Sequence, residues 1–118
     1  MRDLSEMHGP AGQLLAGVMD NGFRLSEAQV GYFREQGYVS GIRLLNDRQV
    51  DQLREELARL ADPAHPGHSL FHEYHSNESA NPDTVLFHAL GAWRVEQGFH
   101  DLLWNPLFVR AAEQLLGG

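Results

Sequence analysis

The feature that most constrains the fold is an amphipathic helix in the middle of the chain. Four apolar residues recur at spacings of three, four and three: Val50, Leu53, Leu57 and Leu60. This spacing places them on one helical face, and we expect the two central leucines to be buried in the folded domain. Asn46 and Gln49 have the spacing of a capping box, and Asp62-Pro63 marks the end. The acids of residues 47–62 are predicted to form a solvated face.

Residues 26–42 predict a second helix followed by a short strand. Ser26 and Gln29 again have capping-box spacing, and Gly37 suits a left-handed C-terminal cap. The helix should therefore span residues 27–36. The aromatic and β-branched residues of segment 38–42 favour a strand.

The last part of the chain predicts two more helices. Residues 98–104 are expected to form a short helix. Asn105 and Pro106 then have the residue types that begin a helix, and Gly117 suits its end. The predicted buried stripe of this last helix consists of Phe108, Ala111, Ala112 and Leu115.

Two segments are rich in helix breakers. Residues 1–24 are predicted to form a variable N-terminal arm, and residues 62–83 an irregular excursion in which 69–74 is a candidate extended segment. Residues 84–88 are a second strand candidate, and 89–94 could extend it as a helix instead. Four helices and one or two strands without a hairpin motif predict a piece of a larger α+β domain, because isolated strands need neighbours.

Composition excludes several classes of function. The formal charge is −7 and the nine arginines are scattered without any lysine, so a nucleic-acid groove is not expected. No apolar run approaches the roughly 20 residues that cross a membrane. The absence of cysteine excludes disulfides, thiolate zinc sites and cysteine nucleophiles. A reducing cytoplasm fits this composition, and we predict a cytoplasmic protein.

One group of histidines has the spacing of a metal site. Four histidines follow one another at intervals of three, four and three: His65, His68, His72 and His75. On a helix they would stack on one face and could bind zinc or nickel. Pro63, Pro66 and Gly67 break such a helix. The sequence therefore favours a solvated, histidine-rich loop, with a metal site as the alternative.

Two pairs of adjacent polar residues are also candidate site residues. The adjacent pairs His72-Glu73 and His100-Asp101 are predicted to point apart, since neighbours on a helix or strand diverge. No shared metal or catalytic role follows for either pair.

His88 and Arg94 also have ordinary structural interpretations. His88 lies in an apolar run and is expected to be a hydrogen-bonded core histidine. Arg94 has two interpretations: it could reach a carboxylate or a CoA phosphate in a complete protein, or it could form a structural ion pair with Glu96 or Asp101. Four aromatic residues are expected in the core or on a surface that covers a missing barrel: Trp93, Phe99, Trp104 and Phe108.

Two segments together resemble a known family. Residues 25–45 contain a capped helix with an aromatic near its end, a Gly-Tyr step and then Leu44-Leu45. Residues 87–117 contain Trp-Asn-Pro at 104–106 and the closing run Ala-Glu-Gln-Leu-Leu-Gly. The first is similar to the opening of phytanoyl-CoA dioxygenase family proteins, and the second resembles the helical stretch that precedes their catalytic barrel.

The resemblance implies a fold and a pair of cofactors. The family fold is a double-stranded β-helix, or jelly roll, with helices packed outside it. Its iron(II) is held by a His-x-Asp pair and a distant His, with open positions for 2-oxoglutarate and oxygen. None of the seven histidines here is followed two residues later by an acid. Residues 25–118 are therefore expected to be the helical N-terminal layer and first strands of an incomplete barrel.

The expected function follows from this resemblance. The chain is predicted to be the N-terminal fragment of an Fe(II)/2-oxoglutarate-dependent dioxygenase that hydroxylates an organic small molecule or an acyl-CoA. The fragment itself should bind neither cofactor and should be inactive alone, so no catalytic, cofactor-binding or metal residue is assigned to it. Neither nucleic acid nor membrane is an expected partner. The alternative is a non-catalytic helical interaction module derived from the same family.

Overall fold

The computed structural model describes residues 1–117, which have an α+β architecture with a two-stranded antiparallel sheet. The main helices are α1 (Glu27–Gln36), α2 (Asp47–Leu60), α3 (Gln97–Asp101) and α4 (Pro106–Leu116). The strands are β1 (Glu73–His75) and β2 (His88–Leu90). Short 3-10 helices are η1 (Leu4–Glu6), η2 (His68–Leu70), η3 (Ala92–Arg94) and η4 (Leu102–Trp104).

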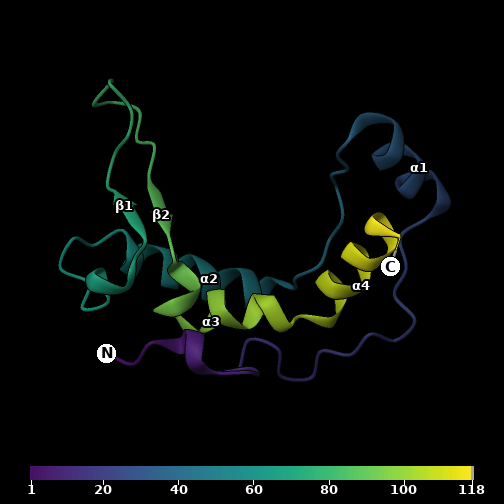
Figure 1. Cartoon of the computed structure of the whole chain (residues 1–118), viewed down its shortest axis with the longest axis horizontal. Coiled ribbons are helices and arrows are strands. Elements are labelled where there is room, and N and C mark those ends of the chain that lie inside the picture. Colours follow the sequence, from purple (N-terminus) through teal and green to yellow (C-terminus); the bar gives the residue numbers. More distant parts are fainter. Residues whose placement is uncertain (118) are drawn as a thin grey trace.

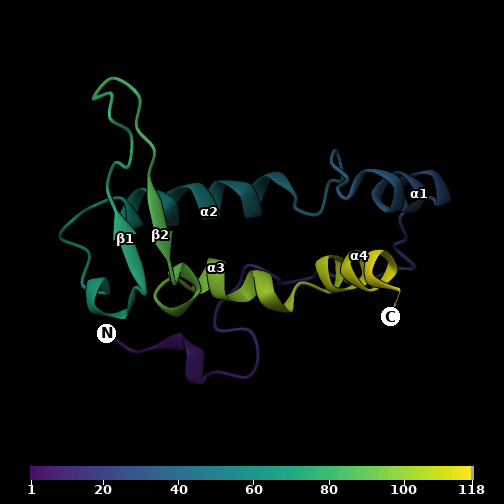
Figure 2. The ribbon, with the colours of Figure 1, turned by 45° about the horizontal axis from the view of Figure 1, so that its top comes forward.

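The helices form two rows in an elongated molecule. Helices α1 and α2 make one row and α3 and α4 the other, with α2 against α3 and α1 against α4 (Figure 2). The hairpin of β1 and β2 projects away from the helices (Figure 1). The radius of gyration is 16.4 Å, whereas a compact domain of this length would have roughly 13–14 Å. No helix in residues 1–117 combines the length and apolar character needed to cross a bilayer.

The predicted helix starts are confirmed. Ser26 with Gln29 caps α1, and Asn46 with Gln49 caps α2, each as a reciprocal capping box. The Asn105 side chain accepts a hydrogen bond from the second residue of α4. These contacts span only two or three residues, so local sequence is enough to form them. The short helix predicted at 98–104 is present as α3 followed by η4.

Two predicted strands were misplaced, whereas the extended candidate at 69–74 overlaps β1. Residues 38–42 form no strand, because Gly41 has a φ of 76° that turns the backbone out of the extended region. The strand expected at 84–88 occurs instead at His88–Leu90. Thr84 belongs to the hairpin loop, where its amide donates to the carbonyl of Asn81 at 3.1 Å.

The buried face of α2 also differs from the prediction. Gln49, Glu56 and Leu60 are buried, whereas Leu57 is 45% exposed. Helix α3 lies against the side of α2 that carries Glu56, because the amide of Gly98 donates to Glu56 at 2.6 Å. The expectation that every acid of 47–62 is solvated is therefore wrong for Glu56.

The apolar stripe of α4 is mostly uncovered. Only Ala111 of the four predicted residues is buried, while Phe108 and Ala112 are exposed. Trp93 and Phe99 are half-buried, and Trp104 is exposed. Helix α1 contains no fully buried residue. These helices therefore leave much of their apolar surface open to solvent.

The N-terminal arm contributes to the core. Leu4 and Leu14 are buried, and the Leu14 carbonyl accepts hydrogen bonds of 2.9 Å from both Arg48 and Gln49 of α2. Residues 1–24 thus supply packing that composition alone did not indicate.

Candidate functional site

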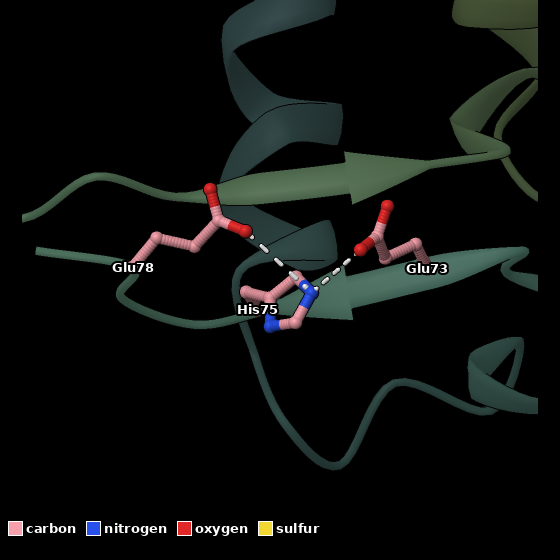
Figure 3. A group of neighbouring side chains, drawn as sticks. All are labelled: Glu73, His75 and Glu78. Carbon is pink, nitrogen blue, oxygen red and sulfur yellow. Dashed lines mark hydrogen bonds and ion pairs between the residues drawn. The ribbon is translucent and has the colours of Figure 1, made fainter.

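The solvent-facing side of the β1–β2 hairpin gathers four potential ligand residues. They are Glu73, His75, Glu78 and His88, which we call the hairpin cluster (Figure 3 shows the first three). His75 Nε2 lies 3.0 Å from Glu73 Oε1 and 3.5 Å from Glu78 Oε1. His88 Nδ1 lies 3.2 Å from Glu78 Oε1, and its Nε2 lies 3.9 Å from Glu73 Oε2. Ligand atoms of Glu73, His75 and Glu78 therefore lie within 4.8 Å of one another, and His88 lies directly beside this group.

Strand geometry explains this convergence. Glu73 and His75 are two residues apart on β1, so their side chains lie on the same face. His88 is the register partner of His75 on β2, which places its side chain beside that of His75. Glu78 lies beyond β1, where its amide donates to the Leu86 carbonyl at 2.8 Å and keeps it next to the ladder.

The opposite face of the hairpin anchors it to the helices. Tyr74 donates its hydroxyl to the carbonyl of Leu60 at 3.0 Å, at the end of α2. Its ring centroid lies 4.2 Å from that of His68 and 5.5 Å from that of Phe87. This aromatic packing holds the hairpin in place and leaves the hairpin cluster facing solvent.

The hairpin cluster has two chemical interpretations. A hydrogen bond from His75 holds the pKa of the Glu73 carboxyl below its usual range. Exposed pairs of this kind contribute little to stability. Imidazole nitrogens and carboxylate oxygens are also the ligands that divalent first-row metals use in proteins. The arrangement can therefore serve as a set of surface ion pairs or as a metal site.

The four histidines of the predicted loop are dispersed by the structure. His65 is buried and His68 is half-buried among aromatic rings, so the expectation that both are solvated is wrong. His72 is exposed. Only His75 joins the hairpin cluster. The four do not share a helical face, because this segment contains η2 and β1 rather than one helix.

His88 is the site residue that sequence reasoning misplaced. It was expected in the core, but it lies on the hairpin surface beside Glu78. His88 lies opposite His75 because of the register in which β1 and β2 pair, and residues 76–87 connect the two strands. No short turn motif marks that hairpin, so the sequence offered no local signal for the pairing.

A second group of charges lies between α2 and the segment before α3. Glu96 is buried and accepts two hydrogen bonds from Arg59, at 2.9 and 3.1 Å. His65 Nδ1 accepts a hydrogen bond from the Gly67 amide, so in a neutral ring Nε2 carries the proton that bonds Glu96 at 3.0 Å. Burial raises the pKa of Glu96, but the hydrogen bonds from Arg59 and His65 outweigh it and hold the pKa below its usual range. This group is fully paired and stabilises the fold.

Two predicted pairings differ in the structure. His100 and Asp101 do not point apart: both are buried, and His100 Nδ1 lies 3.1 Å from Asp101 Oδ1. The same carboxylate accepts from the amides of residues 11 and 12, so it ties the N-terminal arm to α3. Arg94 pairs with neither Glu96 nor Asp101 but with Asp3, whose pKa its hydrogen bonds hold well below the usual range.

The described residues do not fit the iron centre of the phytanoyl-CoA dioxygenase family. That centre needs His-x-Asp, whereas the hairpin carries the reverse order, Glu73-x-His75. Five surface hollows within residues 1–117 are lined by residues outside the hairpin cluster, so none of these five offers 2-oxoglutarate an adjoining pocket. Comparisons with models of protein families and with curated proteins found no match.

Proposed function

We propose that the helices of this chain form the outer layer of an Fe(II)- and 2-oxoglutarate-dependent dioxygenase of the phytanoyl-CoA dioxygenase type. In the complete enzyme this layer packs against a double-stranded β-helix that carries the iron ligands. The layer supplies scaffold and part of the wall of the substrate site. The substrate class is an organic small molecule or an acyl-CoA, which the complete enzyme hydroxylates.

The observation that carries this proposal is the uncovered apolar surface. Within residues 1–117, thirteen large apolar side chains are exposed, and only six apolar side chains are buried. Contiguous exposed apolar surface marks a face that packs against another part of a protein. Five of the thirteen residues lie on α4 or on η4 directly before it: Leu103, Trp104, Phe108, Val109 and Leu116. The exposed aromatic residues concentrate on α1, α4 and the segments that adjoin them: Tyr32, Tyr38, Trp104 and Phe108.

A surface hollow beside α2 and α4 supports the same proposal. It has a volume of about 450 Å³ and lies along residues 39–45, which connect α1 to α2; Val50 of α2 and Phe108 of α4 complete its mainly apolar lining. Layered domains cover such surfaces with a second sheet or helix layer. A barrel packed here would fill the hollow and bury Phe108.

Turnover of 2-oxoglutarate tests the proposal. The chain is extended along its reading frame through a His-x-Asp motif and supplied with iron(II), 2-oxoglutarate, ascorbate and oxygen. We expect succinate from the extended protein and none from residues 1–118 above a protein-free control. Replacement of the added His or Asp by Ala should abolish turnover. Succinate from residues 1–118, or none from the extended protein, would contradict the proposal.

The packing of the layer has its own test in the extended protein. Phe108→Asp should destabilise it, because the ring is expected to be buried against the barrel. Val85→Asp is the matched control, since Val85 is also an exposed apolar residue but lies in the hairpin loop. Equal melting temperatures for the two variants would argue against a barrel on this face.

The alternative function is a non-catalytic helical interaction module. The apolar hollow beside Phe108 would equally suit an apolar segment of another protein. A stop codon directly after codon 118, together with a stable monomer that binds a protein partner through this hollow, would favour the module over the oxygenase.

A further inference from the structure

We propose that Glu73, His75 and Glu78 of the hairpin cluster bind one divalent transition metal of the zinc class, with His88 joining as a fourth ligand once its side chain rotates toward them. This site is separate from the iron centre of the proposed oxygenase and does not depend on that proposal. It would give the hairpin a metal-stabilised conformation at the end of the molecule remote from α1 and α4 (Figure 1).

The spacing of the donor atoms carries the proposal. Metal–ligand bonds of about 2.0–2.2 Å place neighbouring ligand atoms roughly 3.0–3.5 Å apart. His75 Nε2 lies 3.0 Å from Glu73 Oε1 and 3.5 Å from Glu78 Oε1. His88 Nδ1 lies 3.2 Å from the same Glu78 oxygen. One carboxylate oxygen therefore lies within ligand spacing of both imidazoles.

The charge of the hairpin cluster matches a dication. With both imidazoles neutral, the two carboxylates leave a formal charge of −2 at one surface point. The cluster includes no lysine or arginine, and within residues 1–117 the ion pairs of its two carboxylates are all with histidine. A divalent ion would neutralise both carboxylates at once, whereas each neutral histidine has only one N–H to donate to them.

The backbone already holds these side chains together. The register of β1 and β2 pairs His75 with His88. Beyond this pair, the hydrogen bond from the Glu78 amide to the Leu86 carbonyl holds the start of the loop together. Tyr74 fixes the other face through its bond to the Leu60 carbonyl. A metal would therefore need rotamer adjustment rather than a change of fold.

The donor types select the class of metal. Two nitrogen and two oxygen ligands suit zinc and its first-row neighbours. Calcium and magnesium prefer sites built from oxygen alone. We therefore expect zinc and cobalt(II) to bind and magnesium not to compete at equal concentration.

Calorimetric titration of the untagged 118-residue chain with zinc chloride tests the site. We expect one zinc per chain. The double variant His75→Ala/His88→Ala should weaken binding by at least about tenfold. Even the loss of a residue that only hydrogen-bonds a metal ligand weakens metal binding by about 10–100-fold. Glu78→Gln, which keeps the size of the side chain, should also weaken it. Far-UV circular dichroism checks that each variant keeps its helices.

His72→Ala is the matched control. His72 is an exposed histidine next to β1 that lies outside the hairpin cluster, so its removal should leave zinc affinity unchanged. Cobalt(II) provides a second measurement, because imidazole coordination gives it a visible absorption band that the double variant should lose. Zinc affinity equal in the native chain and the double variant, or lost equally in His72→Ala, would overturn the proposal. So would magnesium displacing zinc at equal concentration.

Discussion

The Glu56 carboxylate accepts a hydrogen bond of 2.6 Å from the backbone amide of Gly98, and this contact joins α2 to α3. A β-carbon at position 98 would clash with Glu56 Oε2. The two helices approach this closely because residue 98 has no side chain. Burial raises the pKa of Glu56, although the hydrogen bonds from Gly98 and Gln52 partly oppose that effect.

Gly98→Ala should therefore destabilise the chain. The added methyl group forces Glu56 or α3 to move, and overpacking of this kind costs about 1–3 kcal/mol. Chemical denaturation measures the loss. Gly31→Ala is the matched control, because a β-carbon there meets nothing within 4 Å in the interior of α1. Gly31→Ala should stabilise the helix by about 0.5–1 kcal/mol. If it instead lowered the unfolding free energy as much as Gly98→Ala, the close Glu56–Gly98 contact would not explain the loss at Gly98.

Truncation of leucines tests the observed helical phase of α2. Leu60 is 1% exposed and Leu14 of the N-terminal arm is 0% exposed, so Leu60→Ala and Leu14→Ala should each cost about 2–5 kcal/mol of unfolding free energy. Leu57→Ala should stay within about 0.5 kcal/mol of the native chain, as most surface substitutions do. Thermal melting of the three variants measures the difference. A larger loss at Leu57 than at Leu60 would show that the other face of α2 is the buried one.

The pH dependence of stability should report Glu96. Its pKa is lowered in the folded state, so the ionised carboxylate stabilises the fold above its unfolded pKa of about 4.3. That contribution is lost as pH falls through the lower, folded pKa. Glu96→Gln should cost about 1–2 kcal/mol at pH 7, allowing for the solvent exposure of Arg59, and its deficit should shrink as the solution is acidified below pH 4.

Urea denaturation across that pH range measures the Glu96 effect. Glu55→Gln serves as control, since Glu55 is an exposed carboxylate on α2 and its replacement should change stability little. Glu56, whose pKa is raised, acts in the opposite direction: it favours folding more as pH falls through its folded pKa toward its unfolded pKa. A Glu96→Gln deficit that persists undiminished at low pH would mean that packing, rather than charge, accounts for the loss.

The helix starts could be predicted from sequence because each depends on groups two or three residues apart. Ser26 and Asn46 each form capping hydrogen bonds with a residue three positions later, so these bonds do not depend on the rest of the fold. The α+β class followed from the same signals. The order and spacing of these elements resemble those of the oxygenase family. Membership of that family stays a proposal.

Strand positions and the hairpin cluster could not be predicted in this way. The bounds of β2 depend on pairing with β1 across a long loop, and no turn motif specifies that register. The predicted strand at 38–42 had suitable residues but no partner, and Gly41 turns its backbone. Placing His88 beside His75 therefore required the folded hairpin.

The sequence by itself determined the capped helices of this protein, their polar and apolar faces and the types of ligand residue available. Only the tertiary structure decided which face of α2 is covered, which acids are buried, and which histidines meet carboxylates. Asp101, for example, binds amides of the N-terminal arm about 90 residues away in sequence. The physical reason is the sequence separation of the interacting groups. Capping hydrogen bonds form within one helical turn, whereas burial and cross-strand pairing depend on which distant segment packs against each surface.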